Sequence, residues 1–314
     1  MDKLSRLVGA VSCAAVVALA ACSGNSSMTP TTGTPGMQSQ AMHGGQFSPN
    51  GFSVGKPVYM RTRFSANPNV QPDILLNYSN GPVLAKPKMY FIFWGFKANK
   101  DPDKIKPLLI AYAKSIGGTP YNNIYTQYYG PTKADIKNPN AQFGGAFADN
   151  TNPIPTHPSD AQVAAESLVG VTHFGYNANA SYVVVTAHNH SSIGFGSSWC
   201  AYHSATSSSG QLVSYTNLPY IPDAGPNCGA NFLNPPPNDE TGADEGVTIV
   251  EGHEYGESVT DPNPPSGWYN GQYGEIGDIC AWQDIENDTF KNGNVFTAQP
   301  MFSNASQSCV HHYP

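Results

Sequence analysis

A histidine and two glutamates in the C-terminal third of the sequence have the types and spacing of a metal site. His253, Glu254 and Glu257 lie in the segment EGHEYGESVTDP, at residues 251–262. On a helix, His253 and Glu257 point from the same face, where both could bind one cation. Glu254 would then be free to accept a proton from water bound to that cation. The spacing therefore predicts metal-assisted hydrolysis with Glu254 as the catalytic base.

The same segment resembles the metal-binding helix of the zincin metallopeptidases, whose H-E-x-x-H motif supplies two zinc-binding histidines and a general-base glutamate. Here Glu257 stands in place of the second histidine, and a carboxylate oxygen binds zinc at about 2.0–2.2 Å, much as imidazole does. In the thermolysin-like branch a downstream glutamate is the third ligand, with an aspartate behind it. The resemblance therefore implies that His253, Glu257 and Glu275 bind zinc. Asp278 would orient a ligand from behind, and Asp261 is the alternative third ligand.

Two other interpretations of these residues remain open. The acids could bind calcium for stability alone, although calcium prefers an all-oxygen shell, which counts against a site containing His253. The histidine and the acids could also form a hydrogen-bonded cluster at the surface, with no cation. Zinc is therefore the expected cofactor, and calcium is the weaker alternative.

Other candidate residues have less support. His188 and His190 are two apart on a predicted strand, so they share a face and could bind metal, although the polar end of a buried strand is the commoner case. His311 and His312 are expected in a solvated C-terminal tail. A serine hydrolase is disfavoured because the G-x-S-x-G match in the sequence, GFSVG at 51–55, lies in the predicted tether and not between a strand and a helix.

The composition limits the partners. Only 12% of the 314 residues are charged, and the formal net charge is −7. A nucleic acid is therefore not an expected partner, because binding a phosphate backbone needs clustered positive charge. If the protein is an enzyme, the expected substrate is a peptide or a protein.

The elements that must position these residues can be predicted from periodicity and from helix-ending residues. The run at 89–96 is almost continuously apolar, as in a buried strand, and two further strands are predicted at 181–190 and 211–221. Helices are predicted at 105–116, where Gly117 ends the apolar repeat, and after Ser159, which can cap one. The mixture predicts a single α/β or α+β domain, with an active-site helix and a loop-rich, disulfide-bonded C-terminal part.

Four cysteines lie within this domain: Cys200, Cys228, Cys280 and Cys309. An even number of cysteines in an exported protein predicts two disulfides, and four cysteines allow three pairings, which the sequence leaves open. A zinc site made of all four thiolates is the alternative, but no C-x-x-C spacing supports it.

The N-terminus carries export signals. The apolar stretch after Lys3 and Arg6 is too short and too rich in alanine for a good membrane span. It ends in the letters LAAC at 19–22, which resemble the lipobox of bacterial lipoproteins. The resemblance implies cleavage before Cys22 and a lipid on that cysteine, which would anchor the exported protein to a membrane of the cell envelope. A plain secretory signal is the alternative.

The rest of the chain divides by composition. Residues 23–75 are rich in Ser, Thr, Gly and Pro and are predicted to be a disordered tether between the signal at 1–22 and a globular domain at 76–314. Within that domain, ILLNYSNGPVL, MYFIFWG and SWCAYHS resemble the secreted exordium, or phosphate-induced, family. Cys200 and His203 are the positions of its CAYH pattern. This resemblance implies an extracellular domain and favours the alternative function, a non-enzymatic binding or signalling protein at the cell surface.

Overall fold

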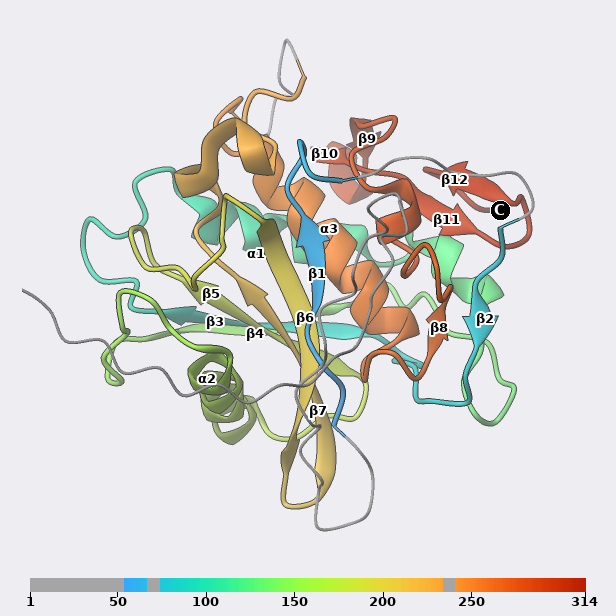
Figure 1. Ribbon diagram of the computed structural model, residues 1–314, viewed down its shortest axis with the longest axis horizontal. Helices are drawn as coiled ribbons and strands as arrows, with labels where there is room; N and C mark the ends of the chain where they lie inside the picture. The colour runs from blue at the N-terminus through green and yellow to red at the C-terminus, as the bar shows by residue number, and fades with distance from the viewer. Residues whose placement is uncertain (1–53, 67–73, 234–240) are drawn as a thin grey trace, which may run out of the picture. The chain divides into compact units, whose positions relative to one another are not determined.

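A six-stranded sheet forms the centre of the protein (Figure 1). The computed structural model describes residues 54–66, 74–233 and 241–314. The strands lie in the order β1-β6-β7-β5-β3-β4, and the neighbours from β7 to β4 are parallel, whereas β6 and β1 run antiparallel to theirs. Their bounds are β1 (Val58–Arg61), β3 (Lys88–Trp94), β4 (Phe143–Asp149), β5 (Ala180–Thr186), β6 (Trp199–Ser208) and β7 (Gln211–Leu218). The predicted mixed α/β class is confirmed.

Three helices cover the two faces of this sheet. They are α1 (Ile105–Ile116), α2 (Asp160–Phe174) and α3 (Glu245–Thr260). Side chains alternate between the faces of a strand, so Phe91 and Phe93 of β3 pack in the core with α1 and α3, whereas Ile92 packs with α2. Both faces of the central strands are therefore buried.

The predicted helix end at Gly117 and the predicted helix start at Ser159 are both present. Helix α1 spans the predicted apolar repeat and ends at Gly117. Helix α2 begins with a capping box, in which the Ser159 side chain accepts a hydrogen bond from the Gln162 N–H and the Gln162 side chain accepts one from the Ser159 N–H. Both predictions are confirmed.

Helix α3 is buried along its whole length, between the sheet and the C-terminal segments. Its two central glycines permit close packing. A Cβ atom on Gly252 would lie 2.8 Å from the Tyr112 hydroxyl, and one on Gly256 would lie 2.9 Å from the Tyr125 hydroxyl. The small residues therefore let two tyrosines approach the helix that carries the candidate site.

The C-terminal part consists of loops, short sheets and 3₁₀ turns, as predicted. Its short strands pair as β9 with β10, β11 with β12, and β8 with β2. The strands are β2 (Asn77–Tyr78), β8 (Trp268–Tyr269), β9 (Glu286–Thr289), β10 (Val295–Ala298), β11 (Met301–Ser303) and β12 (Ser308–Val310). Two 3₁₀ turns lie here, η3 (Asp278–Cys280) and η4 (Lys291–Gly293), and two lie earlier in the described chain, η1 (Asn122–Gln127) and η2 (Ile221–Cys228).

Two disulfides are present, Cys200–Cys228 and Cys280–Cys309. The prediction of two bridges is confirmed, and the pairing left open by the sequence is the nearest-neighbour one. Disulfides persist in oxidising compartments, so they indicate an exported or extracellular protein.

The predicted tether needs one correction. It was expected to run to residue 75, but β1 (Val58–Arg61) lies within it and pairs with β6 at the edge of the central sheet. The apolar side chain of Met60 is fully buried, which explains why a short segment with so few core residues is ordered here. The predicted signal at 1–22, the lipobox and Cys22 lie outside the described residues. No helix in the described ranges is long and apolar enough to cross a membrane.

A buried carboxyl pair joins α2 to the end of β4. Asp149 accepts hydrogen bonds from the backbone N–H groups of Thr151 and Asn152 and from the Asn152 amide, which outweigh the effect of burial and lower its pKa. Glu166, 3% exposed, lies beside it. Burial and the charge of Asp149 raise the pKa of Glu166 to about 8. The folded protein therefore keeps a proton on Glu166 near neutral pH.

We expect this proton to make stability depend on pH. The unfolded chain releases it near the ordinary pKa of 4.5, and the folded protein releases it near 8. Between these values the native state binds the extra proton, so the free energy of unfolding falls as pH rises from about 5 to about 8. Glu166→Gln cannot titrate and should reduce this fall. Urea unfolding of both proteins at several pH values measures the two slopes, and equal slopes would contradict the assignment.

Candidate metal centre

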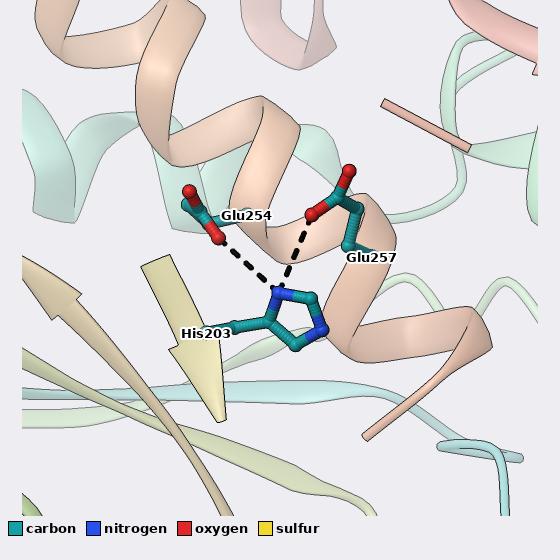
Figure 2. A group of neighbouring side chains, drawn as sticks. All are labelled: His203, Glu254 and Glu257. Atoms are coloured by element: carbon teal, nitrogen blue, oxygen red, sulfur yellow. Dashed lines mark hydrogen bonds and ion pairs between the residues drawn. The ribbon is translucent and has the colours of Figure 1, made fainter. Parts of the chain in front are cut away.

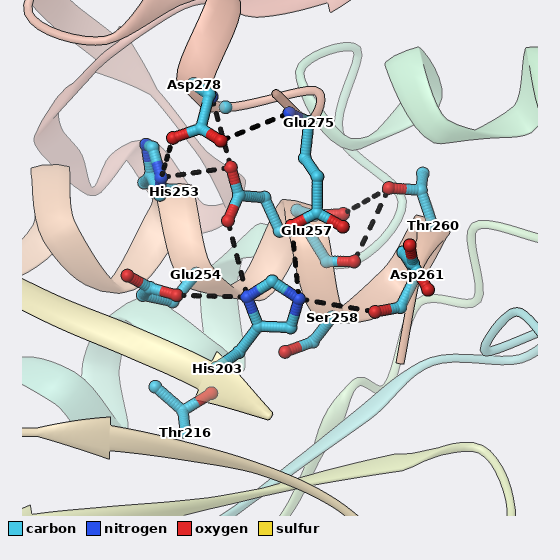
Figure 3. Close-up of polar contacts among 12 residues, drawn as sticks. His203, Thr216, His253, Glu254, Glu257, Ser258, Thr260, Asp261, Glu275 and Asp278 are labelled. Atoms are coloured by element: carbon cyan, nitrogen blue, oxygen red, sulfur yellow. Dashed lines mark hydrogen bonds and ion pairs between the residues drawn. The ribbon is translucent and has the colours of Figure 1, made fainter. Parts of the chain in front are cut away.

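Three parts of the fold bring histidines and carboxylates together (Figure 3). Strand β6 carries His203, whose side chain points toward α3. Helix α3 carries the predicted residues His253, Glu254 and Glu257. Glu275 lies in the segment before η3, and Asp278 is the first residue of η3. All of these residues except Glu275 form two groups, in each of which the ligand atoms lie within 4.8 Å of one another, and Glu257 belongs to both groups.

The first group is His203, Glu254 and Glu257 (Figure 2). His203 Nδ1 lies 3.3 Å from Glu254 Oε2 and 3.3 Å from Glu257 Oε2. All three side chains are 0% exposed. We call this group the inner group.

The second group is His253, Glu257 and Asp278, which we call the outer group. His253 Nε2 lies 3.0 Å from Glu257 Oε1 and 3.7 Å from Asp278 Oδ1. The backbone N–H of Asp278 donates a hydrogen bond to Glu257 Oε1 and so fixes the segment against α3. The Asp278 side chain is 21% exposed, so the outer group, unlike the inner one, reaches the surface.

The second ring nitrogen of each histidine has an oxygen partner. His203 Nε2 lies 3.2 Å from the Asp261 carbonyl, to which it can donate, and 3.3 Å from Glu275 Oε2. His253 Nδ1 lies 3.4 Å from Gln299 Oε1, and the Gln299 amide donates to the Gly277 carbonyl. Metal-binding histidines commonly have this arrangement, because the outer hydrogen bond fixes the tautomer and leaves the other nitrogen for the cation.

The structure distributes the predicted residues differently from the zincin pattern. Asp278, expected behind a ligand, belongs to the outer group with His253, whereas Glu275, expected as the third ligand, lies beside His203. Asp261, the alternative ligand, lies outside both groups and contributes its backbone carbonyl. The surface cluster considered as an alternative does not fit the position of these side chains, since His253, Glu254 and Glu257 are 0% exposed.

His203 is the residue that sequence reasoning missed as a ligand. In the sequence it is marked only by the CAYH pattern of the exordium resemblance, which assigns it no metal. Its place on a strand, 50 residues before His253, gave no sign that it lies against α3.

The other histidines form separate contacts. His188 pairs with Asp223, and His190 Nδ1 lies 2.9 Å from the Pro155 carbonyl, so the two do not form one metal group. His311 was expected in a solvated tail, but its side chain is only 10% exposed, and its Nδ1 lies 2.7 Å from Asp288 Oδ2. A third possible metal group lies near it at the surface and consists of Glu286, Asp288 and His312.

The centre has a large excess of carboxylates. Four acids pair with its two histidines, and no lysine or arginine within the described parts of the chain forms an ion pair with them. The acids are Glu254, Glu257, Glu275 and Asp278. Buried carboxylates are costly unless paired or bound to a metal. The arrangement therefore favours a bound cation.

The two histidines hold protons strongly when only carboxylates surround them. Burial opposes the charge on His203, but Glu254 and Glu257 outweigh it and raise its pKa to about 10. The pKa of His253 is raised to about 9 by Glu257 and Glu254, again against burial. Protons and a cation compete for the same nitrogens, so metal binding should weaken as the pH falls.

Comparisons with known proteins found no similar protein: no family model, no curated protein and no solved structure matches the chain. Imidazole nitrogens and carboxylate oxygens are ligands that zinc takes in proteins. Tetrahedral zinc with bonds of about 2.0–2.2 Å has ligand atoms roughly 3.3–3.6 Å apart, close to the separations around His203 and His253. The residues present can therefore hold a metal ion.

Proposed function

We propose that the protein is an exported zinc-dependent hydrolase that acts on peptides or proteins. The observation that carries the proposal is the outer group, in which His253, Glu257 and Asp278 converge next to Glu254 and reach the surface on one side. Catalytic zinc sites combine three protein ligands with an open position for water or substrate. The partly exposed Asp278 side chain is consistent with such a position.

Zinc bound at this group would lower the pKa of a bound water toward about 7 and polarise a substrate carbonyl. Glu254 follows His253 on α3 and is assigned the proton transfer. Its Oε2 lies 3.3 Å from His203 Nδ1, and its Oε1 has no hydrogen-bond partner. That free oxygen can accept a proton from water and return it to the leaving amine.

The proposal includes the cellular location. The two disulfides support export. The LAAC letters at 19–22 support a lipid on Cys22, and the polar chain after it would then separate the domain from the membrane.

A second candidate is a non-enzymatic surface protein in which the cation stabilises the fold. The burial of the centre favours it, because His203, His253, Glu254 and Glu257 are 0% exposed. Structural zinc sites are closed, with protein ligands at all positions. The two candidates share the metal and differ in whether a substrate reaches it.

Elemental analysis combined with a hydrolysis assay distinguishes them. We expect purified protein to contain stoichiometric zinc and to hydrolyse a casein-type substrate, and a chelator to remove both metal and activity. His253→Ala should lose the outer zinc and the activity, and His188→Ala, whose histidine lies in a separate contact, is the matched control. Zinc or calcium without hydrolysis would favour the structural candidate. Protein without metal would refute both metal-based candidates and support a binding module.

A further inference from the structure

We propose that the centre binds two divalent cations, one in the inner group and one in the outer group, with Glu257 as the carboxylate that bridges them. This inference rests on the proposed metal centre and adds to it a second cation position, for which His203 is the key ligand.

Glu257 lies between the two histidines (Figure 3). Its Oε1 is 3.0 Å from His253 Nε2, and its Oε2 is 3.3 Å from His203 Nδ1. Each oxygen of the carboxylate therefore faces a different imidazole. A carboxylate that bridges two cations presents its oxygens in this way, and the cations in two-metal hydrolases lie about 3.5–4 Å apart.

Each half of the centre has a further carboxylate and a correctly oriented histidine. Glu254 Oε2 faces His203 Nδ1 in the inner half, and Asp278 Oδ1 faces His253 Nε2 in the outer half. On its far side, His203 Nε2 has the Asp261 carbonyl as acceptor, so the nitrogen left for a cation is the one that faces Glu254 and Glu257. A single-zinc site built on the α3 motif alone would not require this second oriented histidine.

The charge balance also favours two cations. One divalent cation in the outer group leaves Glu254 and Glu275 buried beside a single histidine. Glu275 is 2% exposed, and its ion-pair partner is His203, whose Nε2 lies 3.3 Å from Glu275 Oε2. Glu254 Oε1 has no hydrogen-bond partner. Buried carboxylates in excess of their cationic partners are costly, and a cation in the inner group offsets that cost.

The two positions differ in access to solvent. The inner residues are 0% exposed, whereas Asp278 of the outer group is 21% exposed. We therefore expect the outer cation to exchange first when a chelator is added and the inner cation to leave more slowly. The slow cation supports the fold, and the fast one is accessible to a substrate.

Metal counting on single variants of the full chain tests this inference. We expect two zinc ions per wild-type chain, and one in each of His203→Ala, His203→Gln and His253→Ala. His312→Ala is the matched control for the surface group and should keep two. One zinc per wild-type chain, or loss of the second zinc in His312→Ala with none lost in His203→Gln, would overturn the inference.

A spectroscopic measurement on the wild-type protein avoids the risk that a variant fails to fold. Cobalt(II) replacing zinc at both positions should show magnetic coupling between the ions, and uncoupled cobalt would contradict the bridge. The outcomes separate this inference from the hydrolase proposal. Two coupled ions without hydrolysis would refute only the hydrolase, whereas hydrolysis by protein that holds one zinc would refute only the second position.

Discussion

Replacement of Glu254 by glutamine is expected to lower kcat on a casein-type substrate by about 10²–10⁴-fold, the usual contribution of a general acid or base. The glutamine amide has nearly the same shape, but it cannot accept the proton of a bound water. The zinc held through His253 should remain, because His253, Glu257 and Asp278 are unchanged. The kinetic assay and the metal content are measured on the same preparation.

Glu251→Gln is the matched control for this variant. Glu251 lies three residues earlier on α3, is equally buried and belongs to none of the metal groups. The same substitution there should leave the activity unchanged. Full activity in Glu254→Gln would show that another group accepts the proton, whereas loss of the outer zinc would show that Glu254 holds that ion.

Metal removal is expected to have the largest effect on stability. A ligand that binds only the folded state stabilises it by about 4 kcal/mol when its free concentration is 1,000 times its Kd. For a domain of this size, that corresponds to a fall in Tm of roughly 8–16 °C when a chelator is added. The physical cause is the buried carboxylates, which lose their counter-charge when the cation leaves.

Thermal unfolding with and without chelator measures this fall, and added zinc should reverse it. Magnesium should not, because it binds poorly to imidazole and prefers oxygen ligands with retained water. His253→Ala should start from a lower Tm and show a smaller response to the chelator. An unchanged Tm in chelated wild-type protein would mean that the acids of the centre are neutralised by protons, and the metal proposal would fail.

The sequence was sufficient where a feature depends on neighbours along the chain. The apolar repeat at 105–116 and the capping residue Ser159 predicted α1 and α2, because helix formation and capping act over three or four residues. The four-residue spacing likewise predicted His253 and Glu257 on one face of α3, and in the structure His253 Nε2 lies 3.0 Å from Glu257 Oε1.

Tertiary structure decided the features that depend on distant segments. No local pattern could show that Val58–Arg61 would pair with β6, since strand pairing joins segments of any separation. For the same reason the sequence could not choose among the three cysteine pairings, whereas the fold places Cys200 beside Cys228.

The composition of the metal centre was decided in the same way. His203 precedes His253 by 50 positions, and its ring reaches Glu254 and Glu257 only because β6 packs against α3. The choice between Glu275 and Asp278 at the outer group depends on how the loop before η3 crosses the helix, and the two residues are too close in sequence for spacing to separate them. A helix motif can therefore predict the ligands that the helix itself supplies, whereas the remaining ligands are determined by packing between elements, which depends on the whole core.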